Sequence, residues 1–254
     1  MENVQGYRDD GVVLRTQKLG EADRIITLLS RQNGRVRAVA KGVRRTKSRF
    51  GARLEPFTHV DVLIHPGRSL DVITQAEVIR PYGAPLAGDY PRYTAGTAML
   101  ETAERFTPEE KEPALRQFLL LIGGLRALGE TGEDAREPRL VLDAYLLRSL
   151  AVAGYAPVLE ECARCGASGA ADGARLTAFA VAAGGMVCTS CRPPGAASPS
   201  SQTVALMLAL LRGDWDGAMR SERRQRVECS GLVAAYLQWH LEHSIRSLRH
   251  VERA

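Results

Sequence analysis

The stretch "GRVRAVAKGVRRTKSRFGARLEPF", residues 34–57, contains the strand pattern from which the fold can be inferred. Its first part alternates between two sets of residues, which are Val36, Ala38 and Ala40 on one side and Arg35, Arg37 and Val39 on the other. A period of two is typical of a β-strand with one buried face. From residue 31 to residue 54 the chain has nine Lys or Arg and no Asp or Glu. The sequence therefore predicts a strand followed by a strongly cationic connection.

Further short strands surround this one in the first 80 residues. Stretches rich in β-branched or alternating apolar residues occupy 11–17, 24–30, 57–67 and 69–79, with short polar or Gly-containing turns between most of them. Five short strands with tight connections are typical of a small closed barrel. We therefore expect a β-barrel domain over residues 1–80.

The periodicity changes after the Pro/Gly-rich stretch at residues 80–92. Helical spacing predicts helices over residues 92–106, 108–130, 137–157, 201–213 and 231–250. The start at residue 108 is favoured by Pro108 and the acids that follow it, because both are common in the first turn of a helix. We expect an α+β protein with four parts: a barrel (1–80), a helical domain (81–157), a cysteine insert (158–195) and a C-terminal helical part (196–254).

Two C-x-x-C pairs define the insert: Cys162 with Cys165, and Cys188 with Cys191. Two such knuckles place four thiolates around one ion, and the closed tetrahedron that results leaves no position for a catalytic water. We therefore predict one structural Zn²⁺, with a redox-active or incidental pair as the alternative. The fifth cysteine, Cys229, lies in a helical pattern and is expected to be a small buried side chain.

The cationic residues after residue 34 suggest a polyanionic partner. Residues 1–80 contain 15 Lys or Arg and 9 Asp or Glu, whereas residues 81–254 contain 19 and 20. No amphipathic helix accompanies the basic run, so nucleic acid fits better than a membrane. Few aromatic residues are available for stacking, so we expect contacts to phosphates and weak sequence preference. The candidate nucleic-acid ligands are Arg35, Arg37, Lys41, Arg44, Arg45, Lys47, Arg49 and Arg53.

Several functional classes are disfavoured. No apolar run approaches the length of a membrane span, and the N-terminus lacks the pattern of a secretory signal, so we expect a cytoplasmic protein. Phosphate-binding, nucleotide-binding and nucleophile-elbow motifs are absent from the sequence. The "HLE" at residues 240–242 is similar to part of the deaminase signature, but both cysteine pairs precede it. We expect no catalytic residues, and a zinc-containing RNA-binding module remains an alternative.

The string "GEADRIITLLSRQNGRVRAVAKGVRRTKSRFGARLEPF" (20–57) resembles the N-terminal signature of the RecO family of bacterial recombination mediators. The stretch "YAPVLEECARCG" together with "CTSC" resembles the zinc insert of that family. The resemblance implies an OB-fold followed by a helical domain, and a nucleoid-associated protein of DNA repair and recombination. It implies binding to single- and double-stranded DNA, strand annealing, and help in loading RecA onto strands coated by single-strand-binding protein (SSB).

The implied partners are RecR and the acidic C-terminal tail of SSB, within the RecF/RecR pathway. Carried over by position, the DNA contacts come from residues 35–53. A site for the SSB tail is expected to combine a cation with an apolar groove near the C-terminal helices, with Arg126, Arg139 and Arg148 as candidates.

Overall fold

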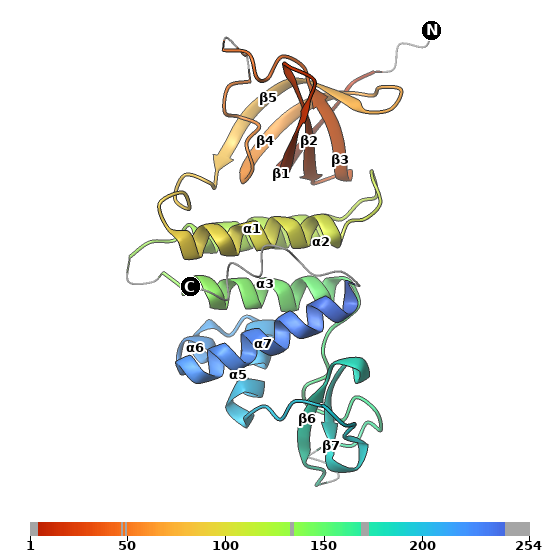
Figure 1. The fold of residues 1–254 in the computed structure, drawn as a ribbon, viewed down its shortest axis with the longest axis vertical. Coiled ribbons are helices and arrows are strands. Elements are labelled where there is room, and N and C mark those ends of the chain that lie inside the picture. The colour runs from red at the N-terminus through yellow and green to blue at the C-terminus, as the bar shows by residue number, and fades with distance from the viewer. Residues whose placement is uncertain (1–4, 47, 49, 133–134, 169–172, 242–254) are drawn as a thin grey trace. The chain divides into compact units, whose positions relative to one another are not determined.

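The computed structural model describes residues 5–46, 48, 50–132, 135–168 and 173–241. The chain divides into two compact units, one within residues 1–135 and one within residues 136–252. The first unit contains a five-stranded sheet and two helices, and the second contains helices and a two-stranded sheet (Figure 1). The four-part division expected from the sequence remains a prediction.

The first unit begins with a closed barrel in the strand order β1-β2-β3-β5-β4. All neighbouring strands are antiparallel except β3 and β5, which are parallel. This is the expected barrel of five short strands. Their bounds are β1 (Tyr7–Leu19), β2 (Asp23–Ser30), β3 (Gly34–Ala40), β4 (Thr58–His65) and β5 (Asp71–Pro81).

Strand β1 begins four residues before the predicted start at residue 11, because residues 7–12 pair with β4. The polar sequence around Asp9 hides this extension from pattern analysis. Asp9 is buried, and its carboxylate accepts hydrogen bonds from the backbone N–H groups of Gln32 and Asn33. The carboxylate therefore closes the turn between β2 and β3 and fixes where β3 starts.

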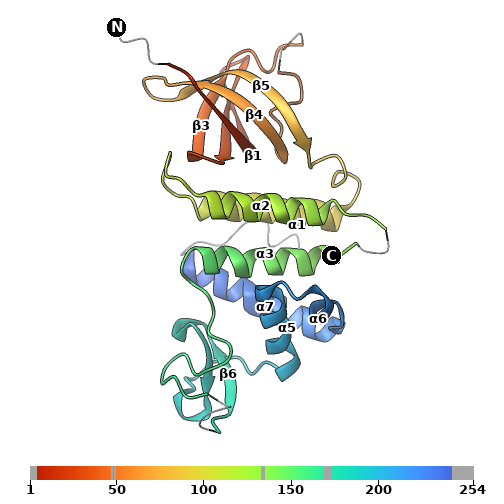
Figure 2. The same ribbon diagram turned by 180° about the vertical axis from the view of Figure 1, so that it is seen from behind.

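Helices α1 (Tyr90–Arg105) and α2 (Leu115–Leu128) lie side by side next to the barrel (Figures 1 and 2). The Asp89 side chain caps α1 by accepting a hydrogen bond from the N–H of Arg92. Gly96 allows α1 to approach the barrel, since a Cβ there would lie 2.9 Å from the ring of Phe57. The guanidinium of Arg92 donates hydrogen bonds to the carbonyls of Leu128 and Glu130 at the end of α2.

The prediction that a helix begins at residue 108 is wrong, because α2 begins only at Leu115. The preceding residues run along the start of β3 instead. The N–H of Lys111, which has a φ of 64°, donates a hydrogen bond of 2.8 Å to the carbonyl of Arg35. A Cβ on Gly34 would lie 1.7 Å from the carbonyl oxygen of Glu112, so glycine permits this crossing. A contact distant in sequence thus overrides the local helix-start pattern.

The second unit is built around α3, α5 and α7, which pack against one another. Ser230 of α7 donates a hydrogen bond to buried Asp143 of α3 and accepts one of 2.7 Å from Arg139. Helix α7 begins eight residues before the predicted start because Glu222 and Gln225 form a capping box. The helices among the described residues of this unit are α3 (Pro138–Val152), α5 (Ser201–Arg212), α6 (Trp215–Met219) and α7 (Arg223–His240).

The cysteine-containing part of the second unit is a small hairpin. Strands β6 (Leu176–Ala180) and β7 (Gly185–Cys188) pair antiparallel, with the 3-10 turns η1 (Val181–Ala183) and η2 (Thr189–Cys191) after them. The helix predicted over 231–250 includes residues 242–250, which lie outside the described residues. Over the described part of the chain, every helix is too short or too polar to cross a bilayer.

The Arg92 contacts generate a prediction about stability. Substituting Arg92→Ala should lower the unfolding free energy of the first unit by about 1.5–3 kcal/mol, because charge-assisted hydrogen bonds to the end of α2 are lost. Both tryptophans, Trp215 and Trp239, lie in the second unit. The measurement is therefore hydrogen exchange of the α1 and α2 amides in increasing urea. The control is Arg105→Ala, at an exposed position of α1. Equal protection in the two variants would contradict a stabilising role for the Arg92 hydrogen bonds.

Candidate metal centre and cationic surface

The four cysteines of the insert meet at one point. The sulfur atoms of Cys162, Cys165, Cys188 and Cys191 all lie within 4.8 Å of one another, and the Sγ atoms of Cys165 and Cys188 are 3.9 Å apart. A tetrahedral ion with Zn–S bonds of about 2.3 Å requires sulfurs about 3.8 Å apart. The predicted cluster is confirmed as a four-cysteine group that could bind a metal ion.

Local backbone geometry brings the two knuckles together. Gly166, with a φ of 73°, follows the first knuckle, and its N–H donates to the carbonyl of Cys162 at 2.8 Å. The segment before this knuckle lies against β7, where a Cβ on Gly185 would be 2.1 Å from the carbonyl oxygen of Val158. Around the sulfurs, the buried hydrophobic side chains are few: Ala178, Ala180 and Val187. Such a small core cannot by itself order the insert, which supports a structural role for the thiolates.

The pKa values of the thiols in the cluster are shifted in opposite directions. Burial opposes ionisation of Cys162, but the backbone N–H groups of Cys188, Cys165 and Arg164 lower its pKa to about 6. Hydrogen bonding with Cys165 and the other cysteines raises the pKa of Cys191 to about 12. Four adjacent thiolates repel one another, so a divalent cation between them would favour their ionised forms. Cys229 is separate and fully buried, as predicted.

The connection from β3 to β4, residues 41–57, is called the cationic loop here. It begins at the end of β3 that lies away from α1 and α2 (Figure 1). Three of its side chains, Val43, Phe50 and Leu54, are buried in the barrel core. The N–H of Gly42 donates a hydrogen bond of 2.7 Å to the carboxylate of Asp23. Apolar anchors thus hold the loop against the barrel although its other side chains are mostly polar.

The described cations of this loop are all exposed: Lys41, Arg44, Arg45 and Arg53. Arg44 donates hydrogen bonds of 3.3 and 2.8 Å to the carbonyls of Gly20 and Glu21, which position the guanidinium without neutralising it. Arg53 donates to the carbonyl of Ala76 at 3.4 Å. No carboxylate of the described chain forms an ion pair with Lys41, Arg44 or Arg45. Lys47 and Arg49 lie outside the described residues.

Arg35 and Arg37 differ from the loop cations. The sequence predicts both on a solvent-facing side of β3, but each is only partly exposed, because the α1–α2 connection lies beside them. The guanidinium of Arg35 donates a hydrogen bond to the carbonyl of Pro108, and that of Arg37 forms an ion pair of 3.2 Å with Glu110. The predicted cationic residues therefore form two groups. Those on the cationic loop are exposed to solvent, whereas Arg35 and Arg37 on β3 are occupied, that is, their guanidinium groups contact the α1–α2 connection.

Pattern analysis overlooked one cation beside the loop. Lys18, near the end of β1, is exposed and pairs in register with Arg24 of β2. The guanidinium of Arg24 lies 2.6 Å from the carboxylate of Glu55 in the cationic loop, so this side of the hairpin lies against the loop. Only the register between β1 and β2 could have placed Lys18 here from the sequence, and this register depends on the length of the turn between the two strands.

Two of the described histidines, His59 and His240, make contacts within the fold. His59 is hydrogen-bonded to the carboxylate of Asp10 at 2.8 Å, and His240 stacks on Tyr155 with ring centroids 4.5 Å apart. Neither belongs to the four-cysteine cluster. The deaminase-like arrangement of histidine and cysteines considered from the sequence is therefore not formed by the described residues.

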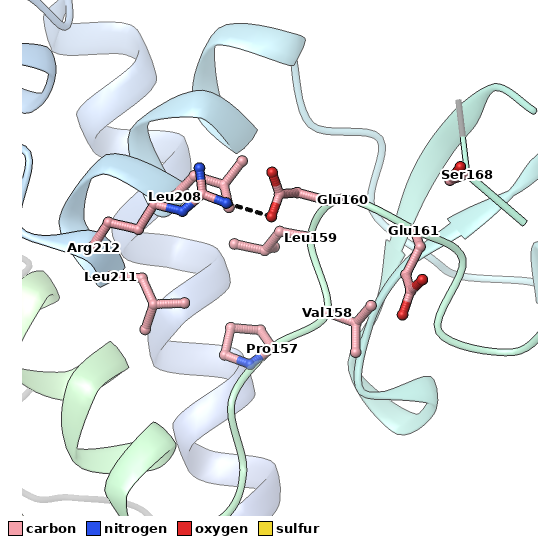
Figure 3. A pocket seen from close by; sticks show the side chains of 9 residues that line it. All are labelled: Pro157, Val158, Leu159, Glu160, Glu161, Ser168, Leu208, Leu211 and Arg212. Atoms are coloured by element: carbon pink, nitrogen blue, oxygen red, sulfur yellow. Dashed lines mark hydrogen bonds and ion pairs between the residues drawn. The ribbon is translucent and has the colours of Figure 1, made fainter. Parts of the chain in front are cut away.

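A pocket of about 490 Å³ lies between the start of the insert and α5 (Figure 3). Its walls are mostly apolar, but Arg212 at its edge is paired with Glu160 at 2.5 Å, and Glu161 adds a second carboxylate. The lining thus has more negative than positive charge, which disfavours an acidic peptide as its ligand. The lining residues are Pro157, Val158, Leu159, Glu160, Glu161, Ser168, Leu208, Leu211 and Arg212.

Comparison with known proteins assigns both halves of the chain. Residues 1–82 match the family model "Recombination protein O N terminal", and residues 87–249 match "Recombination protein O C terminal". Two models therefore cover nearly the whole chain and meet at the end of the barrel strands.

Similar full-length proteins bear the name DNA repair protein RecO. The relative from Thermobifida fusca is 68% identical over 248 residues, covering 98% of this chain and 99% of its own length. Those from Frankia casuarinae and Streptomyces griseus are 62% and 61% identical, covering 98% and 97% of this chain and 99% of their own lengths. With this identity over nearly full length, the chain belongs to the RecO family of DNA repair proteins.

Proposed function

We propose that this chain is a recombination mediator that binds single- and double-stranded DNA through the sugar–phosphate backbone and anneals complementary strands. The cationic loop carries the proposal, because Lys41, Arg44 and Arg45 are exposed on a fixed barrel surface and form no ion pair with any described carboxylate. The names of the relatives, which describe DNA repair proteins, agree with a DNA partner. Arg53, Lys18, and the sequence neighbours Lys47 and Arg49 extend the proposed surface.

Phosphate contacts are sufficient for annealing. Two strands repel each other through their phosphates, and a cationic surface that binds both reduces this repulsion while the base edges stay free to pair. Base stacking contributes little, since Phe50 and Phe57 are buried and Tyr7 donates a hydrogen bond to Asp71. No bond is made or broken in this mechanism, so it requires no catalytic residue.

Membership of the RecO family supports a proposal about the protein partners of this chain. We propose that the chain cooperates with RecR, binds the SSB tail and helps RecA to load, acting in the cytoplasm at the nucleoid. Of the candidate residues for the SSB tail, Arg139 and Arg148 are engaged within their own unit, by Ser230 and by the carbonyl of Leu210. Arg126 remains exposed and is the better candidate.

We further propose one structural Zn²⁺ bound by Cys162, Cys165, Cys188 and Cys191. When bound, the ion supplies only cross-linking of the two knuckles, because four protein thiolates complete its coordination. The hairpin residues position the sulfurs, and the backbone N–H groups around Cys162 stabilise negative charge there.

A charge-reversal experiment tests the proposed DNA surface. We expect Lys41→Glu/Arg45→Glu to reduce affinity for a fluorescein-labelled single strand about 10- to 100-fold at low salt. The dependence of log K on log salt should become shallower by about 1.4, or about 0.7 per lost phosphate contact. Annealing of SSB-coated complementary strands should fall in parallel.

The control variant is Arg105→Glu/Arg116→Glu, which makes the same charge change at exposed positions on α1 and α2. Equal binding by the two variants would contradict the cationic loop as the interface. Competition between matched RNA and DNA strands tests the RNA-binding alternative, and a marked preference for RNA would favour it over the proposal.

The metal proposal predicts about one zinc per chain by elemental analysis. Cys165→Ser should abolish this content and remove hydrogen-exchange protection from β6 and β7, because the insert then lacks its cross-link. Cys229→Ala should retain the zinc, since Cys229 lies outside the cluster. Zinc retained at full stoichiometry in Cys165→Ser would contradict the four-thiolate site.

A further inference from the structure

Residues 107–114, "TPEEKEPA", connect α1 to α2 and lie against the first half of β3 (Figure 1). We call them the acidic connection, because Glu109, Glu110 and Glu112 outnumber its one lysine. The sheet is open at this place, since β3 pairs with β5 only through residues 38–40. The connection extends the barrel there through a bridge between Glu110 and Arg35.

Besides the hydrogen bond from Arg35 to the carbonyl of Pro108, three contacts hold the connection to the barrel. The N–H of Lys111 donates to the carbonyl of Arg35, and the Lys111 ammonium lies 2.8 Å from the carboxylate of buried Asp71. The carboxylate of Glu110 lies 3.2 Å from the guanidinium of Arg37. A carboxylate thus takes the position relative to Arg37 that a phosphate oxygen takes in a nucleic-acid complex.

The two arginines are nevertheless incompletely satisfied. The Nε atoms of Arg35 and Arg37 are buried, and neither donates a hydrogen bond to any described residue. Buried polar groups normally have hydrogen-bond partners. These two N–H donors lack one, so the oxygen atoms of a ligand could accept hydrogen bonds from them. The Nε atoms are covered and the acidic connection contacts both guanidinium groups, so movement of this connection would open a path for a phosphate.

The Glu110–Arg37 ion pair is weak enough to be displaced, and the Lys111–Asp71 pair, in which the Asp71 side chain is only 4% exposed, must also separate before the whole connection moves. Glu110 and Arg37 retain side-chain exposures of 37% and 34%, and ion pairs at such positions are screened by salt. Lys111 has a left-handed φ of 64°, an uncommon conformation for a residue with a Cβ, so its release removes backbone strain.

We infer that the acidic connection is an internal competitor for the nucleic-acid surface, in which Glu110 occupies Arg37 until a phosphate displaces it. This inference rests on the proposed function, because it concerns regulation of the same surface. The cationic loop makes the first contact with the strand, and β3 joins the interface when the connection is displaced. Only strands that supply enough phosphate contacts on the loop then engage the arginines of β3.

Neighbouring glutamates provide a matched test. Glu110→Gln removes the carboxylate that pairs with Arg37, whereas Glu109→Gln makes the same charge change at a residue that forms no ion pair with any described residue. The probe is a fluorescein-labelled single strand of mixed sequence, titrated by anisotropy over a series of salt concentrations. We expect Glu110→Gln to bind about 2- to 5-fold more tightly than Glu109→Gln at low salt. Its salt dependence should be steeper by about 0.7, because one more phosphate is neutralised.

A double-mutant cycle combines Arg37→Gln with Glu110→Gln. Arg37→Gln should weaken binding more in the Glu110→Gln background than in the wild-type chain, since only the former has Arg37 free to bind a phosphate. Equal affinity and salt dependence of Glu110→Gln and Glu109→Gln would overturn the inference, as would equal losses from Arg37→Gln in both backgrounds. A purely structural role for Glu110 changes stability without producing a steeper salt dependence.

Hydrogen exchange gives an independent readout on the wild-type chain. Saturation with the same oligonucleotide should reduce protection of the Lys111 amide, and retained or increased protection would overturn the inference. Lys41→Glu/Arg45→Glu separates the two proposals. If that variant binds DNA normally, the proposed function has failed; if it loses binding while Glu110→Gln equals Glu109→Gln, only the internal competitor has failed.

Discussion

The burial of Val43, Phe50 and Leu54 in the barrel is the interaction on which the cationic surface depends. Each such side chain contributes about 1.5–3 kcal/mol when it is fully buried. Two like charges 4 Å apart in water repel by only about 1 kcal/mol, and salt reduces this further. The apolar anchors therefore outweigh the repulsion among the exposed cations. Without them, the same residues would form a basic segment of no fixed position, and its charges would not act together.

The tertiary structure divides the arginines of the basic run into groups that sequence analysis cannot separate. Arg35 and Arg45 are the same residue type in one uninterrupted run, but their neighbours differ. Arg35 contacts a segment that is about 70 residues away in the chain, whereas Arg45 contacts no carboxylate of the described chain. Charge patterns identify where cations are in excess, but the contacts of a folded chain decide which of them are available to a ligand.

The difference between local patterns and contacts distant in sequence also explains which elements could be predicted. The alternation of apolar and polar residues predicted the barrel strands, and the C-x-x-C spacing predicted the four-cysteine cluster. Both patterns are local in the sequence. The start of α2 was mispredicted because Pro108 and its acidic neighbours have the composition of a helix start. Gly34, whose missing Cβ admits the crossing segment, lies far away in sequence, and no local pattern links the two. Likewise, the extension of β1 to Tyr7 depends on pairing with β4.

The way in which Arg44 is held fits a surface that binds any sequence. Carbonyl groups of Gly20 and Glu21 position its guanidinium, so the side chain loses rotational freedom before a strand arrives. Because these acceptors are neutral backbone groups, the positive charge stays available, whereas a carboxylate in their place would cancel it. A phosphate is identical at every nucleotide, and a cation fixed in this way cannot distinguish one base from another. Pre-positioned charge supported by backbone carbonyls would thus provide binding strength without sequence selection, which the proposed strand annealing requires.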